Sequence, residues 1–217
     1  RTVGEYTFAG QYQQSPAPRG GGLIKADWFK EYRESDRPDP FDTVVQSWDC
    51  ANKQKELASY SVCTTWGVAG KNIYLLDVFR KQINSPELKR ALHAFLEQYP
   101  LSNVLIEDRV SGTQLIQELK EEGMANVTAI EPHGEKIMRM HAQTALIENG
   151  FVFLPEKAPW LAVYLHELTT FPMSKHSDQV DSTSQALAWI KAGYFGPSMG
   201  IFHYYRLLSE EQKRTKG

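Results

Sequence analysis

Three strand-like segments follow one another between residues 43 and 80, and they restrict the possible folds more than any other feature of the sequence. TVVQSWDCA at 43–51 alternates β-branched and polar residues, and SYSVCTTWGV at 59–68 and IYLLDVFR at 73–80 have the same strand character. The tight turn AGKN separates the second segment from the third. Because parallel neighbours require long crossover connections, these short connections predict an antiparallel meander.

The rest of the chain alternates helical and extended patterns. Helices are expected at 85–99, 111–123, 134–150, 158–171 and 174–190, and extended segments at 101–108, 126–132 and 151–155. In the first helix, Ser85 is the expected N-cap and Pro86 the first helical residue, and Ser111 is the expected cap of the second. The order βββαβαβα, followed by further helices, predicts an α/β fold in which a mixed β-sheet is flanked by helices.

Proline and glycine mark the expected division of the chain. Residues 1–40 contain QQSPAPRGGG and SDRPDPFD and are predicted to be an irregular arm or inter-domain linker, with LIKADWFKEY as a short strand or helix inside it. Residues 41–195 form the predicted main domain, and 196–217 a C-terminal tail. The N-terminus has no initiator Met and no apolar signal core, so we expect the chain to be part of a longer protein.

Composition narrows the class of protein. With 41% hydrophobic residues the chain can bury a substantial core, and no apolar run approaches the roughly 20 residues of a membrane span. The two cysteines have no zinc-site spacing and are expected to be reduced thiols. The net charge of −2 gives no support for nucleic-acid binding, so any such function has to be argued from a local site.

Four acids occupy unusual places in this plan. Asp49 ends the first strand, Glu107 ends the apolar strand after VLI, and Asp178 and Asp181 lie three residues apart at the start of the last helix. If the first and fourth strands are neighbours, Asp49 and Glu107 meet at one end of the sheet, and a helix packed there adds the other two.

Four carboxylates in one cleft, with no equally obvious basic partners, destabilise a fold unless a cation neutralises them. Hard oxygen ligands in this number suit Mg²⁺ or Mn²⁺, and a pair of such ions can activate a water and stabilise the leaving oxygen in phosphodiester cleavage. Acids at strand ends and helix starts are common, so a structural or solvated role is the alternative for each one taken alone. Their joint order on a βββαβα frame favours a two-metal nuclease.

These features resemble the ribonuclease H-like superfamily, and more narrowly the C-terminal nuclease domain of the large terminase subunit of tailed bacteriophages. The resemblance is carried by the stretches FAGQYQQSPAPRGGGLIKADWF, SWDCANK, LIEDRVSGTQLIQEL, EPHGEKIMRMHAQTALIENGFVFLP and HSDQVDSTSQAL. It covers most of residues 8–190 and implies a ribonuclease H-like domain that cuts concatemeric double-stranded DNA during viral genome packaging. The chain has no GxxxxGK[ST] phosphate loop, as expected of a nuclease domain separate from its ATPase.

Carried over by position, the resemblance implies that Asp49 and Glu107 are metal ligands on the first and central strands. Asp178 and Asp181 match the acidic motif of the C-terminal helix. The family often has two adjacent acids where this chain has Ser177 and Asp178, so either Asp178, Asp181 or both would hold the second Mg²⁺ or Mn²⁺ ion. Lys136 and Arg139 lie where the family tends to keep a basic residue, and are expected to bind substrate.

The partners implied by the resemblance are double-stranded DNA, an N-terminal ATPase domain of the same full-length protein, and the portal and small terminase subunit of the packaging motor. The implied location is the host cell cytoplasm, on the procapsid. Two other interpretations stay open. The same fold serves Holliday-junction resolvases and transposases, and a DNA clamp or motor-docking module without catalysis would bind DNA in the absence of metal and tolerate loss of the acids.

Overall fold

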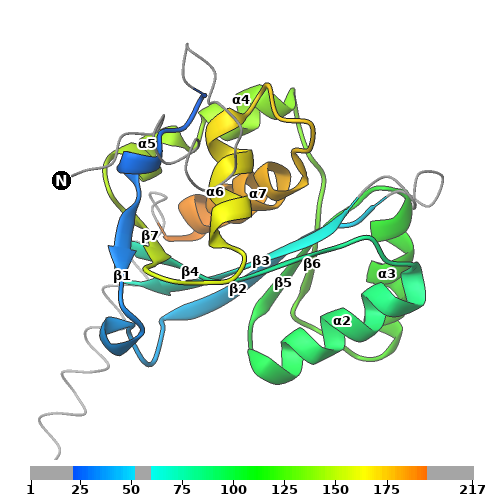
Figure 1. Ribbon diagram of the computed structural model, residues 1–217. Helices are drawn as coiled ribbons and strands as arrows, with labels where there is room; N and C mark the ends of the chain where they lie inside the picture. Colours follow the sequence, from blue (N-terminus) through cyan, green and yellow to red (C-terminus); the bar gives the residue numbers. More distant parts are fainter. Residues whose placement is uncertain (1–21, 52–59, 195–217) are drawn as a thin grey trace, which may run out of the picture.

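The computed structural model describes residues 22–51 and 60–194, and its centre is one mixed β-sheet (Figure 1). The strands are β1 (Lys30–Tyr32), β2 (Thr43–Asp49), β3 (Ser61–Ala69), β4 (Asn72–Lys81), β5 (Asn103–Glu107), β6 (Val127–Ile130) and β7 (Val152–Pro155). Within the described ranges they form a seven-stranded sheet in the order β1-β7-β4-β3-β2-β5-β6. The first 21 residues of the predicted arm and the predicted tail 196–217 lie outside the described residues.

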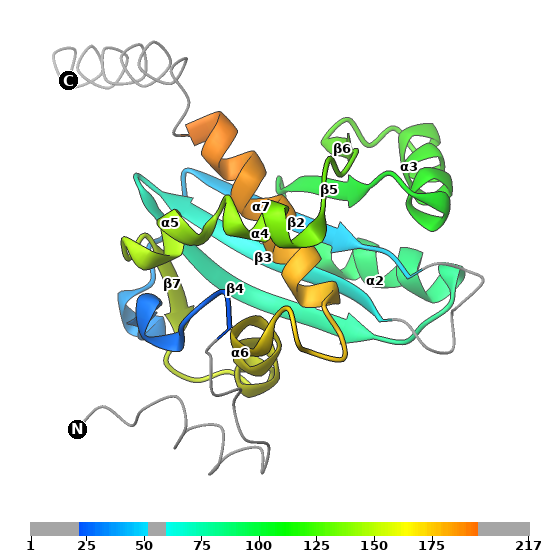
Figure 2. The same cartoon turned by 90° about the horizontal axis from the view of Figure 1, so that it is seen from above.

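Two layers of helices cover the sheet. The helices are η1 (Ala26–Trp28), η2 (Glu34–Asp36), α2 (Ser85–Gln98), α3 (Val110–Glu121), α4 (Lys136–His141), α5 (Thr144–Glu148), α6 (Leu161–Thr170) and α7 (Asp178–Tyr194). Helices α2 and α3 lie on one face, and α4, α6 and α7 lie on the other, with α7 running across β2 and β3 (Figures 1 and 2). The α/β architecture expected from the sequence, a mixed sheet flanked by helices, is confirmed.

The predicted meander is present. Strand β3 pairs antiparallel with both β2 and β4, and Gly70, with a φ of 59°, supports the tight turn between β3 and β4. Strands β5 and β6 then add in parallel on the β2 side, and β7 and β1 add in parallel on the β4 side. The segment LIKADWFKEY contains both of its expected alternatives, η1 and the edge strand β1, so part of the expected arm joins the sheet.

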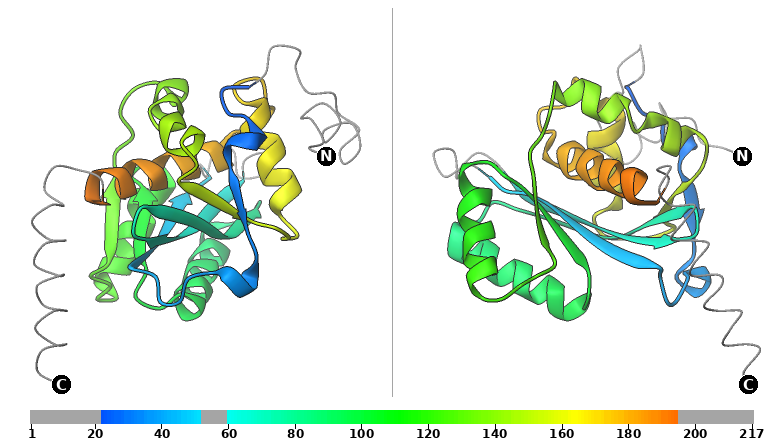
Figure 3. Two further views of the ribbon diagram at one scale, coloured as in Figure 1. Left: turned by 90° about the vertical axis from the view of Figure 1, so that its left-hand side faces the viewer. Right: turned by 180° about the vertical axis from the view of Figure 1, so that it is seen from behind.

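Each face of the sheet has its own apolar core, because successive strand residues point to opposite faces. Val45, Trp66 and Leu105 pack beneath α6 and α7, and Trp48 and Ile106 pack against α2 and α3. The right-hand view of Figure 3 shows the two helical layers on either side of the sheet. The two cysteines, Cys50 and Cys63, are free. Within the described residues, no helix combines the length and apolar character needed to cross a bilayer.

Two helix starts differ from the sequence expectation. The N-cap of α2 is Asn84, one residue earlier than expected: its side chain accepts the Glu87 N–H at 3.0 Å, and the Glu87 carboxylate accepts the Asn84 N–H at 3.0 Å. This capping box satisfies two backbone donors at once, which the Ser85 side chain alone cannot do. Helix α3 begins at Val110, so Ser111 lies inside the helix instead of capping it.

The helix expected over 134–150 is two short helices. The Gln143 N–H donates to the Met140 carbonyl at 2.9 Å, three residues back, and the Thr144 hydroxyl donates to the His141 carbonyl at 2.8 Å. These local bonds replace the regular pattern of the α-helix and end α4 before α5 begins. The prediction of one continuous helix was wrong because it followed the apolar periodicity alone.

Candidate active site

Asp49 and Glu107 lie side by side at one end of the sheet. Strands β2 and β5 are parallel neighbours, with Trp48 opposite Ile106, so the next residue of each strand meets its counterpart. Asp49 shares the face of Ser47, and Glu107 shares the face of Leu105, because side chains alternate along a strand. This face is covered by α7, and the strand-end acids therefore point toward the helix that carries the other two.

Two serines bring α7 close to β2 and β3. The Ser47 hydroxyl donates to the Ser182 carbonyl, and the Ser182 hydroxyl donates to the Ser47 carbonyl, each at 2.7 Å. The Ser182 hydroxyl oxygen also accepts from the Thr64 backbone N–H at 3.1 Å and contacts the Thr64 hydroxyl at 2.7 Å. Gln185, one turn further along, donates to the Ser47 hydroxyl at 3.0 Å. These small, fully bonded side chains hold Asp181, the residue before Ser182, over the end of β2.

The first turn of α7 is held by an acid from another helix. Glu167 of α6 is 4% exposed, and its carboxylate accepts the Gln179 N–H at 2.7 Å and the Gln179 side-chain amide at 2.6 Å. A negative charge at this place satisfies a free backbone donor and complements the helix dipole. Arg80 approaches the same carboxylate, with Nε at 3.6 Å, and stacks over the Tyr60 ring. The N-terminus of α7, which carries Asp178 and Asp181, is therefore held in place by the Glu167 side chain of α6.

The four acids act on one another electrostatically. Burial raises the pKa of Asp49 well above its ordinary value, and the neighbouring charges of Asp181, Glu107 and Asp178 raise it further. Burial also raises the pKa of Glu107 and of Asp178, with nearby cationic side chains acting in the opposite direction. The structure thus brings all four predicted acids to one place, and their mutual repulsion is centred on Asp49.

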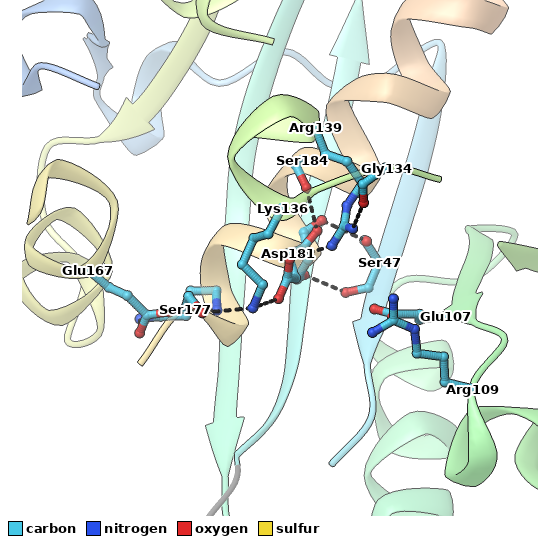
Figure 4. Close-up of polar contacts among 12 residues, drawn as sticks. Ser47, Glu107, Arg109, Gly134, Lys136, Arg139, Glu167, Ser177, Asp181 and Ser184 are labelled. Atoms are coloured by element: carbon cyan, nitrogen blue, oxygen red, sulfur yellow. Dashed lines mark hydrogen bonds and ion pairs between the residues drawn. The ribbon is translucent and has the colours of Figure 1, made fainter. Parts of the chain in front are cut away.

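Basic side chains partner these acids, which the sequence did not predict. Asp181 forms an ion pair with Lys136 and another with Arg139, the latter at 2.8 Å (Figure 4). Lys136 also donates to the Ser177 hydroxyl at 2.7 Å. Arg109 pairs with Glu107 at 2.8 Å from the turn that follows β5. The expectation that the acids lack basic partners was wrong, because α4 folds back along α7 and adds two cations.

These pairings decide how the site fits a metal. In the described part of the chain, no three His, Cys, Asp or Glu side chains already form a group that could hold an ion. Asp181 and Glu107 each point an oxygen to a guanidinium or ammonium group instead. The donors are nevertheless hard carboxylate oxygens on rigid elements, and a cation in their midst would relieve the repulsion on Asp49. The donor chemistry fits Mg²⁺ or Mn²⁺, once the Asp181 and Glu107 carboxylates exchange partners.

Gly112 sets the turn that carries Glu107. A β-carbon at Gly112 would lie 1.9 Å from the Glu107 carbonyl oxygen, so only glycine fits this close approach. The Gly112 N–H also donates to the Arg109 carbonyl at 2.6 Å, which tightens the passage from β5 into α3. Close packing therefore requires glycine in this turn, although the φ of Gly112 lies outside the left-handed region.

Sequence reasoning missed the residues that hold the acids. Ser47 and Ser182 carried a signal, since each is a small polar residue inside an otherwise buried segment and adjoins a predicted acid by one or two positions. Arg109 lies two residues after Glu107, and this spacing was a similar signal in the sequence. Glu167 gave no such signal, because a single acid in an amphipathic helix is typical of a solvated residue.

A family model described as the terminase RNase H-like domain matches residues 46–189. None of the curated proteins searched is similar enough to count as a match. Among solved structures, the large terminase nuclease of thermophilic phage G20c with bound magnesium has a TM-score of 0.60 and 17% identity, over 79% of this chain and 98% of that one. The large terminase of a second thermophilic bacteriophage has a TM-score of 0.56 and 15% identity, over 77% of this chain and 44% of that one.

Proposed function

Because the chain belongs to the family of terminase RNase H-like domains, we propose that it is a metal-dependent endonuclease that cuts concatemeric double-stranded DNA during viral genome packaging. The single observation that carries this proposal is the convergence of Asp49, Glu107, Asp178 and Asp181 from three separate elements, where burial and the neighbouring carboxylates raise the pKa of Asp49. Such a concentration of carboxylates disfavours the folded state and is expected where a cation is to be held.

We assign the metal-holding role to the four acids. Asp49 lies in their midst and is the natural shared ligand, with Glu107 on one side and Asp178 and Asp181 on the other. A pair of divalent ions, when bound, supplies the positive charge that lowers the pKa of an attacking water and stabilises the leaving oxygen. Crystal structures of the G20c nuclease with bound magnesium, cobalt and zinc support the choice of a divalent ion. We propose Mg²⁺ or Mn²⁺ as the working ion.

The basic residues of the site have a role that follows from their pairings. Lys136 and Arg139 each form an ion pair with one oxygen of the Asp181 carboxylate. When the acids are satisfied by cations, these two side chains are free to contact a phosphate oxygen of the DNA, and Arg109 has the same freedom beside Glu107. We therefore propose Lys136 and Arg139 as substrate-binding residues that balance the charge of Asp181 until the substrate binds.

The setting of the reaction is part of the proposal. The chain has a net charge of −2, so we expect DNA to be held mainly through local phosphate contacts with little sequence preference. The chain matches 44% of the large terminase of the second thermophilic bacteriophage, which supports its being the nuclease part of a protein with an N-terminal ATPase domain. The further partners would be the portal and the small terminase subunit, on a procapsid in the host cytoplasm.

Plasmid cleavage tests this function. Supercoiled plasmid is incubated with the chain and Mg²⁺, Mn²⁺ or EDTA, beside Asp49→Ala and the control Asp108→Asn. Asp108 is the neighbouring acid after β5, and its carboxylate accepts the Thr113 hydroxyl at 2.6 Å, a bond that asparagine retains. We expect metal-dependent nicking and linearisation, loss of at least about 10³-fold with Asp49→Ala, and wild-type cutting with Asp108→Asn.

Three results would count against the proposal. DNA binding in EDTA, without cutting by either ion, would favour a clamp or a motor-docking module. Preferential cutting of four-way junctions over plasmid would favour a resolvase. Wild-type cutting by Asp49→Ala would remove the acid cluster from the mechanism altogether.

A further inference from the structure

A pocket of about 450 Å³ adjoins the acid cluster, and most of its lining residues have no role in the proposed metal site. It lies between α4, α7 and the segment that follows β6, and Glu107 and Asp181 form the wall that it shares with the acids. Its size falls within the range of sites that enclose small organic groups. The pocket opens directly beside the place where a phosphate would be cut.

The rest of the pocket is largely apolar. Ile130, Pro132, Ala188 and the indole of Trp189 line it, and Met138 stands at its rim with 65% of its surface exposed. Met138 and the half-buried Trp189 bring two large apolar side chains to the same hollow of the surface, and an apolar patch around a hollow marks a site where a ligand can bind. Such walls suit a flat, largely uncharged group.

The charges that line the pocket disfavour a phosphate inside it. Glu107, Glu131 and Asp181 contribute three carboxylates to its lining, and the arginine among its described lining residues is already engaged. This arginine, Arg139, donates to the Asp181 carboxylate at 2.8 Å and to the Gly134 carbonyl at 3.1 Å. A phosphodiester would meet more negative than positive charge here, whereas a neutral heterocycle would meet apolar walls and nearby hydrogen-bonding groups.

We propose that this pocket is a subsite for one nucleobase of the cut strand, adjacent to the scissile phosphate and withdrawn from the base stack. The inference rests on the proposed nuclease function, because the acids fix where the phosphate lies and hence which part of the nucleotide reaches the pocket. Exposed Met138 is placed to enter the vacated position in the stack, as apolar side chains do when they kink a duplex. Trp189 supplies an aromatic surface, and base–aromatic stacking tolerates every base.

The test compares two ligands that differ only by the base. The chain is titrated in EDTA with deoxyadenosine and with 2-deoxyribose, neither of which carries a phosphate, and the Trp189 indole N–H signal is followed by NMR together with calorimetry. We expect the nucleoside to bind about tenfold more tightly and to shift the Trp189 signal, since a stacking contact of about 1–3 kcal/mol corresponds to a factor of roughly 5 to 150.

Two tryptophan substitutions locate the effect. Ala188→Trp fills the pocket from an exposed position of α7 and is expected to abolish the tenfold preference. Ala145→Trp, at an exposed position of α5 outside the pocket, is expected to retain it. Met138→Ala provides a second variant that removes part of the wall without adding bulk, and should reduce the preference severalfold.

Equal binding of the two ligands would overturn the proposal, and so would an undiminished preference in Ala188→Trp. Neither result would affect the nuclease function, which plasmid cleavage tests separately. Conversely, a chain that shows the base preference but cuts no DNA would refute the nuclease and leave a base-binding pocket.

Discussion

Asp49 is the residue at which the electrostatic cost of the site is concentrated. Burial and three neighbouring carboxylates raise its pKa, so the folded state disfavours the ionised form. We predict that Asp49→Asn raises the melting temperature in EDTA at pH 7 by about 2–4 °C, which corresponds to about 1 kcal/mol for a chain of this size. Differential scanning fluorimetry measures this directly. Asp49, proposed as a metal ligand for catalysis, would then lower the stability of the folded chain.

The raised pKa of Asp49 also determines whether stability rises or falls with pH. Because the pKa of Asp49 is higher in the folded than in the unfolded chain, the folded state binds more protons between an ordinary aspartate value near 4 and the raised value. Wild-type stability therefore falls as the pH rises through this window, and the advantage of Asp49→Asn shrinks toward zero near pH 4. Exposed Asp27→Asn is the control and should follow the wild type. Parallel curves for Asp49→Asn and wild type would refute this explanation.

At the same scale, the acids were predictable and their partners were not. Asp49, Glu107, Asp178 and Asp181 each mark the end or start of an element, so their places follow from the hydrophobic pattern. The pairing of Arg139 with Asp181 joins residues 42 positions apart and depends on how α4 folds back along α7. No local pattern specifies such a long-range contact.

Among the elements, α7 is held to the sheet by a polar contact as well as by apolar packing. Ser182→Ala removes a hydroxyl that donates to the Ser47 carbonyl and accepts from the Thr64 backbone N–H, so both buried groups lose this bond. We predict a loss of about 1–3 kcal/mol in the free energy of unfolding, measured by urea titration. Ser184→Ala is the matched control, because the Ser184 hydroxyl bonds to the Asp181 carbonyl of its own helix. Equal losses in the two variants would refute a specific role for Ser182.

Element types followed from the sequence where short connections or strong periodicity decided them. The meander from β2 to β4 is fixed by its tight turn, and the apolar stripe of α2 matches its buried residues Leu88 and Leu92. The break between α4 and α5 was missed, because the hydroxyl of Thr144 competes for a backbone carbonyl in a way that periodicity does not register. Local hydrogen bonding decided this element, and hydrophobicity did not.

For the whole molecule, the order of the sheet edges depends on distant parts of the chain. Strand β7 lies between β1 and β4, although at least 70 residues separate it from either. Parallel pairings of this kind need crossover connections, and four-residue strands carry too little pattern to name their neighbours. The division of the chain at residues 40 and 195 stays a prediction.

The acid cluster joins β2, β5 and α7, so a bound cation would link parts of the chain that are far apart in the unfolded state. A ligand that binds only the folded state stabilises it by mass action. We predict that Mg²⁺ at about 100 times its dissociation constant raises the melting temperature by about 5–10 °C, which corresponds to about 2.7 kcal/mol. Asp49→Ala should show at most a small shift, and NaCl at matched ionic strength should not reproduce the effect. EDTA should reverse it. An equal rise in Asp49→Ala or in NaCl would show that Mg²⁺ acts by general screening of charge. The four acids would then not form a specific metal site.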